Sequence, residues 1–255
     1  MPSIDFNCDL GESFGAWRMG NDQAVLPYVS SINVACGFHA GDPQTIKQTV
    51  EQASALKIAI GAHPGLPDLR GFGRRAIAVS ANDLYADTLY QIGALAGFAR
   101  VAGTRLTHVK PHGALYHMLD QQLELADAFV RAVRDFDASL LLFGSSTGRF
   151  LQTAQTLGMG CVHEVFADRS YEENGQLTPR ALAGATLDQA DACRQLDLIL
   201  REGIVITRQG SPLALRAETV CLHGDRSDAA AMAQALRATI AAAGFAICVQ
   251  GRGPA

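Results

Sequence analysis

The feature that most constrains the fold is a regular alternation of short apolar runs with longer segments of helical periodicity. The runs span residues 4–8, 32–36, 58–61, 106–109, 140–143, 161–166, 220–222 and 246–249. Their length and their apolar or β-branched content predict buried parallel strands. Because strands that alternate with helices build a parallel sheet, the pattern predicts an α/β fold, a single (β/α) barrel of seven or eight parallel strands.

Several of the intervening helices have recognisable ends. Asp42 precedes a proline, which is the pattern of an N-cap followed by proline at the first helical position. Ser80 and Asp83 have capping-box spacing, and Gly103 ends that helix. Residues 203–215 break the rhythm, because two short apolar runs flank a Gly-Ser-Pro turn and predict an added hairpin. Since no linker divides the chain, we predict one barrel domain over residues 1–255.

Composition narrows the classes of ligand. The 255 residues are 48% hydrophobic and 18% charged, and the formal net charge is −4 with Lys and Arg scattered, which argues against nucleic acid and anionic membranes as partners. No signal peptide and no apolar run of roughly 18 residues is visible. The six cysteines are widely spaced and form no CxxC, which argues against a disulfide framework or a zinc knuckle. We predict a cytoplasmic protein with a small ligand.

Polar residues gather directly after six of the predicted strands. In chain order they are Asp9 and Glu12, His39 and Asp42, His63 and Asp68, Lys110 and His112, Asp168 and Arg169, and His223 and Asp225. In a parallel barrel these strand ends lie at one mouth, where active sites are built. A single such residue would be read as a helix cap or a surface polar group. Six strand ends together indicate catalysis.

Six segments, taken together, resemble one family. They are 5–15 (DFNCDLGESFG), 33–43 (NVACGFHAGDP), 61–75 (GAHPGLPDLRGFGRR), 108–116 (HVKPHGALY), 164–171 (EVFADRSY) and 221–225 (CLHGD). In this order they resemble the LamB/YcsF family over nearly the whole chain. His117 stands where Asn is expected, and Gly65-Leu66 where Ser-Tyr is frequent, which argues against a direct catalytic role for Leu66 or His117.

The resemblance implies a barrel of the glycoside hydrolase/deacetylase type that cleaves 5-oxoproline to glutamate, coupled to hydrolysis of ATP to ADP and phosphate, together with two partner subunits, B and C. Lactam opening is uphill near neutral pH, so the site needs charge clamps, a base for water and stabilisation of developing charge. The predicted catalytic residues are Asp9, Glu12, His39, His63, Lys110 and His112. The predicted substrate- or phosphate-binding residues are Asn7, Asp42, Arg75, Asp168, Arg169 and His223.

The cofactors are less constrained by sequence. No Walker A motif occurs, although Gly144–Gly148 follows a strand and could cradle phosphate, so the subunit that binds ATP is left open. No HExxH occurs either, but ligands from separate strand ends need no local spacing. Asp9, His39 and His63 are the candidate ligands for a divalent metal. Self-association into a homo-oligomer is also left open.

Three rival functions compete with this interpretation. Gly144–Gly148 matches the G-x-S-x-G elbow of serine hydrolases, with Ser146 as nucleophile and Asp168 and His223 following in the required order. A metal-dependent deacetylase of a sugar or amide would use Asp9 and histidines as ligands. A non-enzymatic small-ligand-binding module would bind at the same mouth without turnover. The mixture of acids, imidazoles and cations argues against a pure binder.

Overall fold

The computed structural model describes residues 1–250, so the last five residues of the predicted domain lie outside the described part. The strands are β1 (Ser3–Leu10), β2 (Ser31–Ala35), β3 (Ala59–His63), β4 (Leu106–Val109), β5 (Leu141–Ser145), β6 (Gly160–Phe166), β7 (Ile204–Ile206), β8 (Pro212–Ala214), β9 (Thr219–His223) and β10 (Ala246–Ile247). The α-helices are α1 (Asp22–Val25), α2 (Pro43–Ala55), α3 (Ala81–Val101), α4 (Gly113–Gln121), α5 (Leu123–Phe136), α6 (Phe150–Thr156), α7 (Gln189–Glu202) and α8 (Ala229–Ala242). Two short 3-10 turns, η1 (Leu26–Tyr28) and η2 (Leu69–Gly71), complete the set.

Seven parallel strands close a barrel in the order β1, β2, β3, β4, β5, β6 and β9, and β9 pairs back onto β1. β10 is an eighth parallel strand, but it pairs only with the start of β1, where Ser3 lies opposite Ala246 and Ile4 opposite Ile247. The predicted (β/α) barrel is therefore confirmed, and the closed ring has seven strands.

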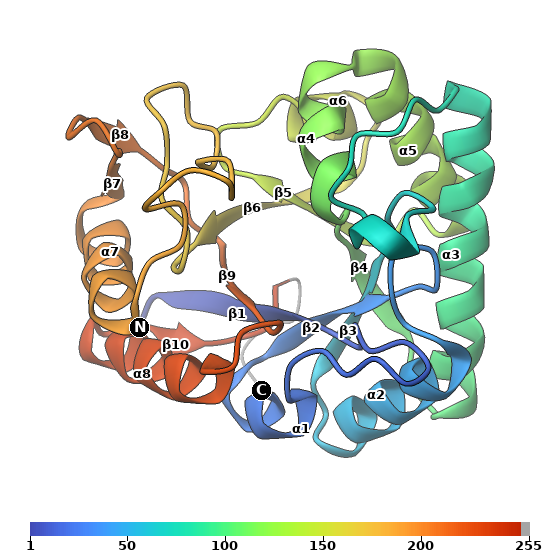
Figure 1. The fold of residues 1–255 in the computed structure, drawn as a ribbon, viewed down its shortest axis with the longest axis horizontal. Helices are drawn as coiled ribbons and strands as arrows, with labels where there is room; N and C mark the ends of the chain where they lie inside the picture. Colours follow the sequence, from blue (N-terminus) through green and yellow to red (C-terminus); the bar gives the residue numbers. More distant parts are fainter. Residues whose placement is uncertain (251–255) are drawn as a thin grey trace.

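Helices surround this ring, with α2, α3 and α5 on one side and α7 and α8 on the other (Figure 1). Strands β2 and β3 are buried along their whole length, because helices cover their outer faces and side chains fill the barrel. In the part of the chain that the structure describes, none of the helices is long and apolar enough to cross a membrane.

The helix starts follow the chemistry of their caps. The Asp42 side chain accepts hydrogen bonds from the backbone N–H groups of Gln44 and Thr45, and Ser80 accepts one from Asp83. Both predicted N-caps are thereby confirmed. Gly203 ends α7 in the left-handed conformation, at φ 69°, where a side chain would be strained.

Two insertions interrupt the βα rhythm. β7 and β8 pair antiparallel, Val205 opposite Leu213, which confirms the predicted hairpin. The chain between β6 and α7, residues 167–188, is a long loop drawn in yellow and orange above the barrel in Figure 1. Short antiparallel bridges between Arg169 and Thr186 and between Tyr171 and Leu177 hold it in place. This loop supplies one wall of the site.

Candidate active site

The barrel interior is polar rather than apolar. Asp5, Asn7 and Asp9 alternate with apolar residues along β1, and all three are buried. Side chains of a strand alternate between its two faces, so these three share the inner face. Asn33 of β2 joins them there, donating from Nδ2 to Asn7 Oδ1 at 2.7 Å and to Asp9 Oδ1 at 2.8 Å. Strand β1 thus presents a column of polar groups to the inside.

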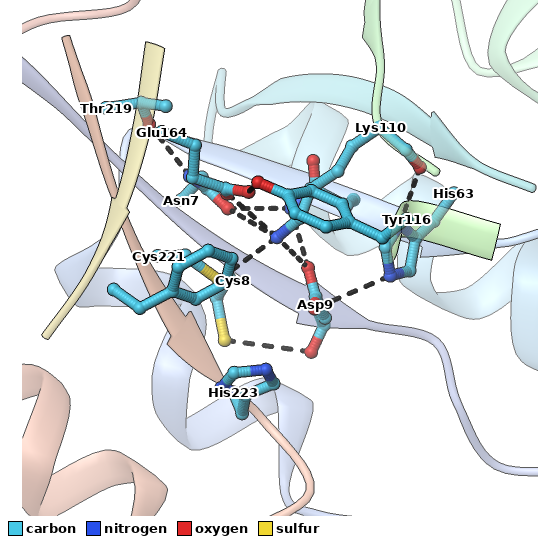
Figure 2. Close-up of polar contacts among 12 residues, drawn as sticks. Asn7, Cys8, Asp9, His63, Lys110, Tyr116, Glu164, Thr219, Cys221 and His223 are labelled. Carbon is cyan, nitrogen blue, oxygen red and sulfur yellow. Dashed lines mark hydrogen bonds and ion pairs between the residues drawn. The ribbon is translucent and has the colours of Figure 1, made fainter. Parts of the chain in front are cut away.

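Lys110, directly after β4, is the centre of the upper part of this column (Figure 2). Its Nζ lies 2.9 Å from Asp9 Oδ1, 2.8 Å from Glu164 Oε1 and 3.0 Å from Cys221 Sγ, and the side chain is 2% exposed. Burial opposes its charge, but Asp9, Cys221 and Glu164 outweigh burial and raise the pKa of Lys110 well above its usual value. The ammonium is therefore charged at physiological pH.

Asp9 is held as a carboxylate by the same contacts. Burial alone would raise its pKa, but Lys110 and His63 hold the pKa of Asp9 well below its usual value. Asn33 is oriented by His108, whose Nε2 lies 2.8 Å from Asn33 Oδ1. Burial, with Lys110 nearby, lowers the pKa of His108 to about 3, so this ring is neutral. Gly61 leaves room for it, since a Cβ at that position would collide with the His108 ring.

Glu164, on β6, completes the lysine's surroundings. Its Oε2 accepts a hydrogen bond from the Tyr116 hydroxyl at 3.0 Å, and its Oε1 accepts one from Asn7 Nδ2 at 3.0 Å. Asn7 Nδ2 also donates to Thr219 Oγ1 at 2.7 Å, which links this centre to the lower half of the barrel. Both carboxylate partners of Lys110 are thus fixed by further hydrogen bonds, so the ammonium has little freedom to move.

Three imidazoles lie beside Asp9. His63 Nδ1 donates to the carbonyl oxygen of Lys110 at 2.8 Å, and His112 Nε2 donates to that of Phe72 at 2.8 Å. His39 stacks face to face on His112, with ring centroids 3.7 Å apart. Both ring nitrogens of His39 are buried without a hydrogen-bond partner in the described part of the chain. Burial, followed by neighbouring imidazoles, lowers the pKa of both His39 and His112 well below the usual value, so both rings are neutral.

Glu12 approaches the imidazoles from the loop after β1. Its Oε1 lies 3.8 Å from His112 Nδ1, and burial, followed by the charge of Asp9, raises the pKa of Glu12 well above its usual value. Glu12, His63 and His112 each offer one ligand atom, and these atoms lie within 4.8 Å of one another, a spacing suited to a metal ion. Of the three predicted metal ligands, His63 belongs to this group, whereas Asp9 and His39 do not.

These groups form the floor of a cavity of about 340 Å³ at the carboxyl ends of the strands. Asp9, Glu12, His63, Lys110 and His112 all line it. Its walls include the guanidinium-bearing residues Arg74, Arg169 and Arg180, together with His117, Tyr116 and residues 176–179. The floor of this cavity carries carboxylates, imidazoles and the Lys110 ammonium, and its wall carries guanidinium groups. A cavity of this size and charge suits a small ligand that carries negative charge.

Other predicted residues lie around the cavity or away from it. Asn7 is buried beneath the floor, and Asp168 stands behind His223, which lines the cavity and has its Nδ1 3.1 Å from the Asp168 carboxylate. Asp42 caps α2, and Arg75 is paired with Asp68 while its side chain is 63% exposed. Neither Asp42 nor Arg75 lines the cavity. Of the six predicted binding residues, two therefore line the cavity, two lie behind its lining and two lie outside the site. The predicted catalytic residue His39 is not part of the lining either.

Ser146, the nucleophile of the rival serine-hydrolase interpretation, is differently engaged. Its hydroxyl oxygen accepts a hydrogen bond from the Arg216 backbone N–H at 2.7 Å. Among the described residues no hydrogen bond joins Ser146 to His223, and Ser146 does not line the cavity. The three residues of the elbow hypothesis do not form a triad here.

Sequence reasoning missed four residues of the site: Glu164, Tyr116, Arg74 and Arg180. Glu164 and Tyr116 stand inside segments that carry the family resemblance, so their polar character beside a strand was available as a signal. Arg180 lies in the long loop 167–188, where no local pattern marks it. His117 also lines the cavity, although its departure from the family pattern argued against a direct role.

A closed parallel barrel with its polar centre at the carboxyl ends of the strands defines an α/β-barrel protein with a candidate active site at the mouth of the barrel. A family 4 carbohydrate esterase from Streptomyces lividans shares this fold, with TM-score 0.50 and 11% identity over 97% of this chain and 92% of that one. The profile of the LamB/YcsF family matches residues 4–252. The chain belongs to the LamB/YcsF family.

Individual relatives agree with this assignment. The 5-oxoprolinase A subunit of Bordetella pertussis is 50% identical over 247 residues, 96% of this chain and 98% of the relative. The 5-oxoprolinase A subunit of Bacillus cereus is also 50% identical, over 97% of this chain and 99% of the relative. A crystal structure of the lactam utilization protein from Thermus thermophilus superposes with TM-score 0.90, at 43% identity over 96% of this chain and 98% of that one.

Proposed function

We propose that this chain is the A subunit of an ATP-dependent 5-oxoprolinase and that its cavity opens the lactam ring of 5-oxoproline to give glutamate. The observation that carries the proposal is the buried Lys110 ammonium, held between Asp9 and Glu164 on the floor of a cavity with a cationic wall. A cyclic amide with a carboxylate needs both features, because its carboxylate must be bound and negative charge develops on the carbonyl oxygen. The names of relatives at 50% identity support the same activity.

The chemistry requires an order of bond breaking. ATP transfers its terminal phosphoryl group to the lactam oxygen, and water then adds to the activated carbon. If phosphate left first, the lactam would re-form, so the ring C–N bond breaks first and the nitrogen takes up a proton. The resulting acyl phosphate reacts with a second water to give glutamate and phosphate. Two waters are consumed, one for the ring and one for the phosphoryl bond.

Lys110 is suited to the charge that builds up in these steps. A fixed ammonium in a water-poor site stabilises a developing oxyanion more strongly than one in water does, and it needs no reorganisation. Asp9 and Glu164 hold it in place from two sides. Glu12 lines the same cavity beside His63 and His112, so the floor also carries carboxylate and imidazole groups that can act on a water molecule.

The arginine wall supplies the anion-binding part of the site. Arg169 is fixed by donating from Nε to the Ala185 carbonyl at 3.0 Å and from Nη2 to that of Thr178 at 2.6 Å. Burial, followed by the charge of Arg180, lowers the pKa of Arg169 to about 10, so it stays cationic at pH 7. Arg180 forms no hydrogen bond or ion pair within residues 1–250. Its free guanidinium can pair with a carboxylate or phosphoryl group.

ATP and the partner subunits belong to the proposal as well. We assign ATP as cosubstrate and subunits B and C as partners, on the strength of the family and of the relatives' designation as one subunit of an enzyme. We place the activity in the cytoplasm, since all six cysteines are free thiols.

The decisive experiment measures 5-oxoproline-dependent ATP hydrolysis and glutamate release, first with this chain alone and then with subunits B and C. We expect little or no release from the chain alone and sustained release from the complete set. Robust release from the chain alone would overturn the requirement for partners. No release from the complete set, together with deacetylation of an N-acetyl sugar by the chain, would replace the proposed function with the deacetylase alternative.

A further inference from the structure

Two histidines on the cavity floor direct bare nitrogen atoms at each other. A backbone carbonyl oxygen only accepts hydrogen bonds, so the ring nitrogen that meets it must carry a proton. His63 Nδ1 meets the Lys110 carbonyl and His112 Nε2 meets the Phe72 carbonyl, each at 2.8 Å. The other two ring nitrogens, His63 Nε2 and His112 Nδ1, face each other at 3.0 Å, and each carries a lone pair whenever its ring holds a single proton.

Two lone pairs at this distance repel each other unless a proton is shared between them or a metal ion lies beside both. Carboxylate oxygens complete the ring of acceptors, because Glu12 Oε1 is 3.8 Å from His112 Nδ1 and Asp9 Oδ2 is 3.4 Å from His63 Nε2. The ligand atoms of Glu12, His63 and His112 lie within 4.8 Å of one another, and Asp9 Oδ2 lies beside His63 at the edge of this group.

Charge balance points the same way. Three carboxylates are buried on or beneath the cavity floor, those of Asp9, Glu12 and Glu164. Lys110 forms ion pairs with Asp9 and with Glu164. Within residues 1–250, Glu12 forms no ion pair with a lysine or arginine. A buried carboxylate without a counter-charge is costly, and a metal ion would remove that cost.

We propose that Glu12, His63 and His112 bind one divalent transition-metal ion, with Asp9 beside it. Two imidazole nitrogens and a carboxylate oxygen favour an ion such as Zn²⁺, Co²⁺ or Mn²⁺ over Mg²⁺ or Ca²⁺, which prefer oxygen ligands. The carbonyl partner of each ring is the outer contact that orients metal-binding histidines. Such an ion lowers the pKa of a bound water. Delivery of that water to the lactam carbon rests on the proposed function, whereas metal binding does not.

The test uses the purified full chain, depleted of metal with a chelator and dialysed. Isothermal titration with Zn²⁺ should show one equivalent per chain, and Co²⁺ should give visible absorption bands that report nitrogen ligands at low coordination number. Metal content by elemental analysis should agree with one equivalent. A chain that binds neither ion in the micromolar range would overturn the inference and leave a shared proton between the two rings.

Variants assign the ligands. His63→Phe and His112→Phe keep a ring in place and remove the nitrogens, and Glu12→Gln removes the charge. Each should weaken Zn²⁺ binding at least about a hundredfold, because loss of a hydrogen-bond partner behind a ligand already costs about 10- to 100-fold. His117→Phe is the matched control, since His117 lines the same cavity but lies outside the ligand group. Equal weakening in the control would contradict the assignment.

Two readouts keep this inference separate from the proposed function. Thermal melting of each variant without metal shows whether it is folded, and wild-type melting should rise with added Zn²⁺, as binding to the native state requires. If the chain binds metal but no glutamate is released with the partners, the function fails and the metal site stands. If glutamate is released from a metal-free complex at the full rate, the function stands and the metal's catalytic role fails.

Discussion

Asp5 and Asp9 lie four residues apart on the inner face of β1, and both are buried, yet their surroundings differ in one respect. Within residues 1–250, the Asp5 side chain accepts hydrogen bonds only from hydroxyl groups, those of Ser30 at 2.7 Å, Ser31 at 2.7 Å and Thr219 at 2.5 Å. Asp9 has an ammonium partner. Burial raises the pKa of Asp5 above its usual value. At Asp9 the charge of Lys110 overcomes burial and holds the pKa of Asp9 well below its usual value.

The comparison shows that burial by itself does not decide whether a carboxylate is ready for chemistry. Desolvation penalises both charges, and a counter-charge at hydrogen-bond distance reverses the result at only one of them. The lower half of the barrel therefore joins its strands through hydrogen bonds between hydroxyl groups and the Asp5 carboxyl group. The upper half is a charged centre that opens to the cavity.

The largest expected effect tests the charged half. Lys110→Met keeps most of the aliphatic stem and removes the charge, so glutamate release by the complete enzyme should fall on the order of a hundredfold or more, as when one preorganised electrostatic stabiliser is lost. The variant should assemble with its partners, and turnover should be expressed per folded chain. Lys47→Met, which breaks only an exposed pair with Glu51, is the matched control.

Loss of Lys110 also leaves Asp9 and Glu164 without their counter-charge, and breaking a buried pair costs about 3–5 kcal/mol of stability. Thermal melting must accordingly be measured with activity. If Lys110→Met has a lower melting temperature while its folded fraction turns over at the normal rate, the role of the lysine is structural. The difference between Asp5 and Asp9 would then have no bearing on catalysis.

The second prediction concerns how the stability cost of replacing Asp5 or Asp9 changes with pH. Asp5→Asn should lower the free energy of unfolding by about 1–3 kcal/mol, because it takes an acceptor away from buried hydroxyl donors. Asp9→Asn should lower it by about 3–5 kcal/mol, because it breaks the buried ion pair with Lys110. The cost of Asp5→Asn should shrink as pH rises from about 4 to about 7, whereas the cost of Asp9→Asn should stay constant over that range. Urea unfolding at several pH values measures both.

The signs follow from the direction of each pKa shift. The pKa of Asp5 is raised on folding, so its stabilisation is complete below the unfolded value of about 3.9 and is lost as pH rises through the folded value. The pKa of Asp9 is lowered, so its stabilisation is complete above about 3.9 and is lost as pH falls. Parallel pH profiles for the two variants would refute the contrast.

Much of the fold was predictable, because strand and helix signals are local. The apolar runs, the Asp42 and Ser80 caps and the hairpin over 203–215 all follow from neighbouring residues. Part of the site was also predictable, since the ends of parallel strands meet at one mouth by geometry alone. This rule brought Asp9, His63, Lys110 and His112 together without any knowledge of side-chain contacts.

The remainder depended on contacts between distant parts of the chain. Lys110 and Glu164 are 54 positions apart, and only closure of the barrel brings them to 2.8 Å. Arg180 reaches the cavity from a long loop whose path no local pattern specifies. Conversely, Asp42 follows a strand but is used as a helix cap, and Arg75 is held outside by Asp68. A position shortly after a strand therefore identifies candidate site residues, but it does not distinguish helix caps from residues that bind the substrate.

A third, smaller effect is expected at Arg180, and it tests whether the arginines of the cavity wall act together with the charged centre around Lys110. Arg180→Gln should raise KM for 5-oxoproline roughly 10- to 100-fold and change kcat much less, because a charge-assisted hydrogen bond to substrate contributes about 1.5–3 kcal/mol. Arg208→Gln, which removes a guanidinium paired with Glu172 beside the hairpin, is the control. A fall in kcat with unchanged KM would place Arg180 at the reacting atoms instead of in substrate binding.

The smallest effect is expected at Asp42, which follows a strand as Asp9 does but lies outside the cavity. Its carboxylate accepts hydrogen bonds from the N–H groups of Gly15, Gln44 and Thr45, which overcome slight burial and lower the pKa of Asp42 to about 2. Asn is also a good N-cap, so Asp42→Asn should cost at most about 1 kcal/mol of stability and leave kcat and KM unchanged. Because the folded pKa of Asp42 is depressed, this small stabilisation should be present above about pH 4 and should disappear as pH falls toward about 2. Asp42→Ala should cost more than Asp42→Asn, again without affecting turnover. A tenfold rise in KM for either variant, with stability unchanged, would return Asp42 to the substrate site and show that the cavity floor does not contain all of the binding groups.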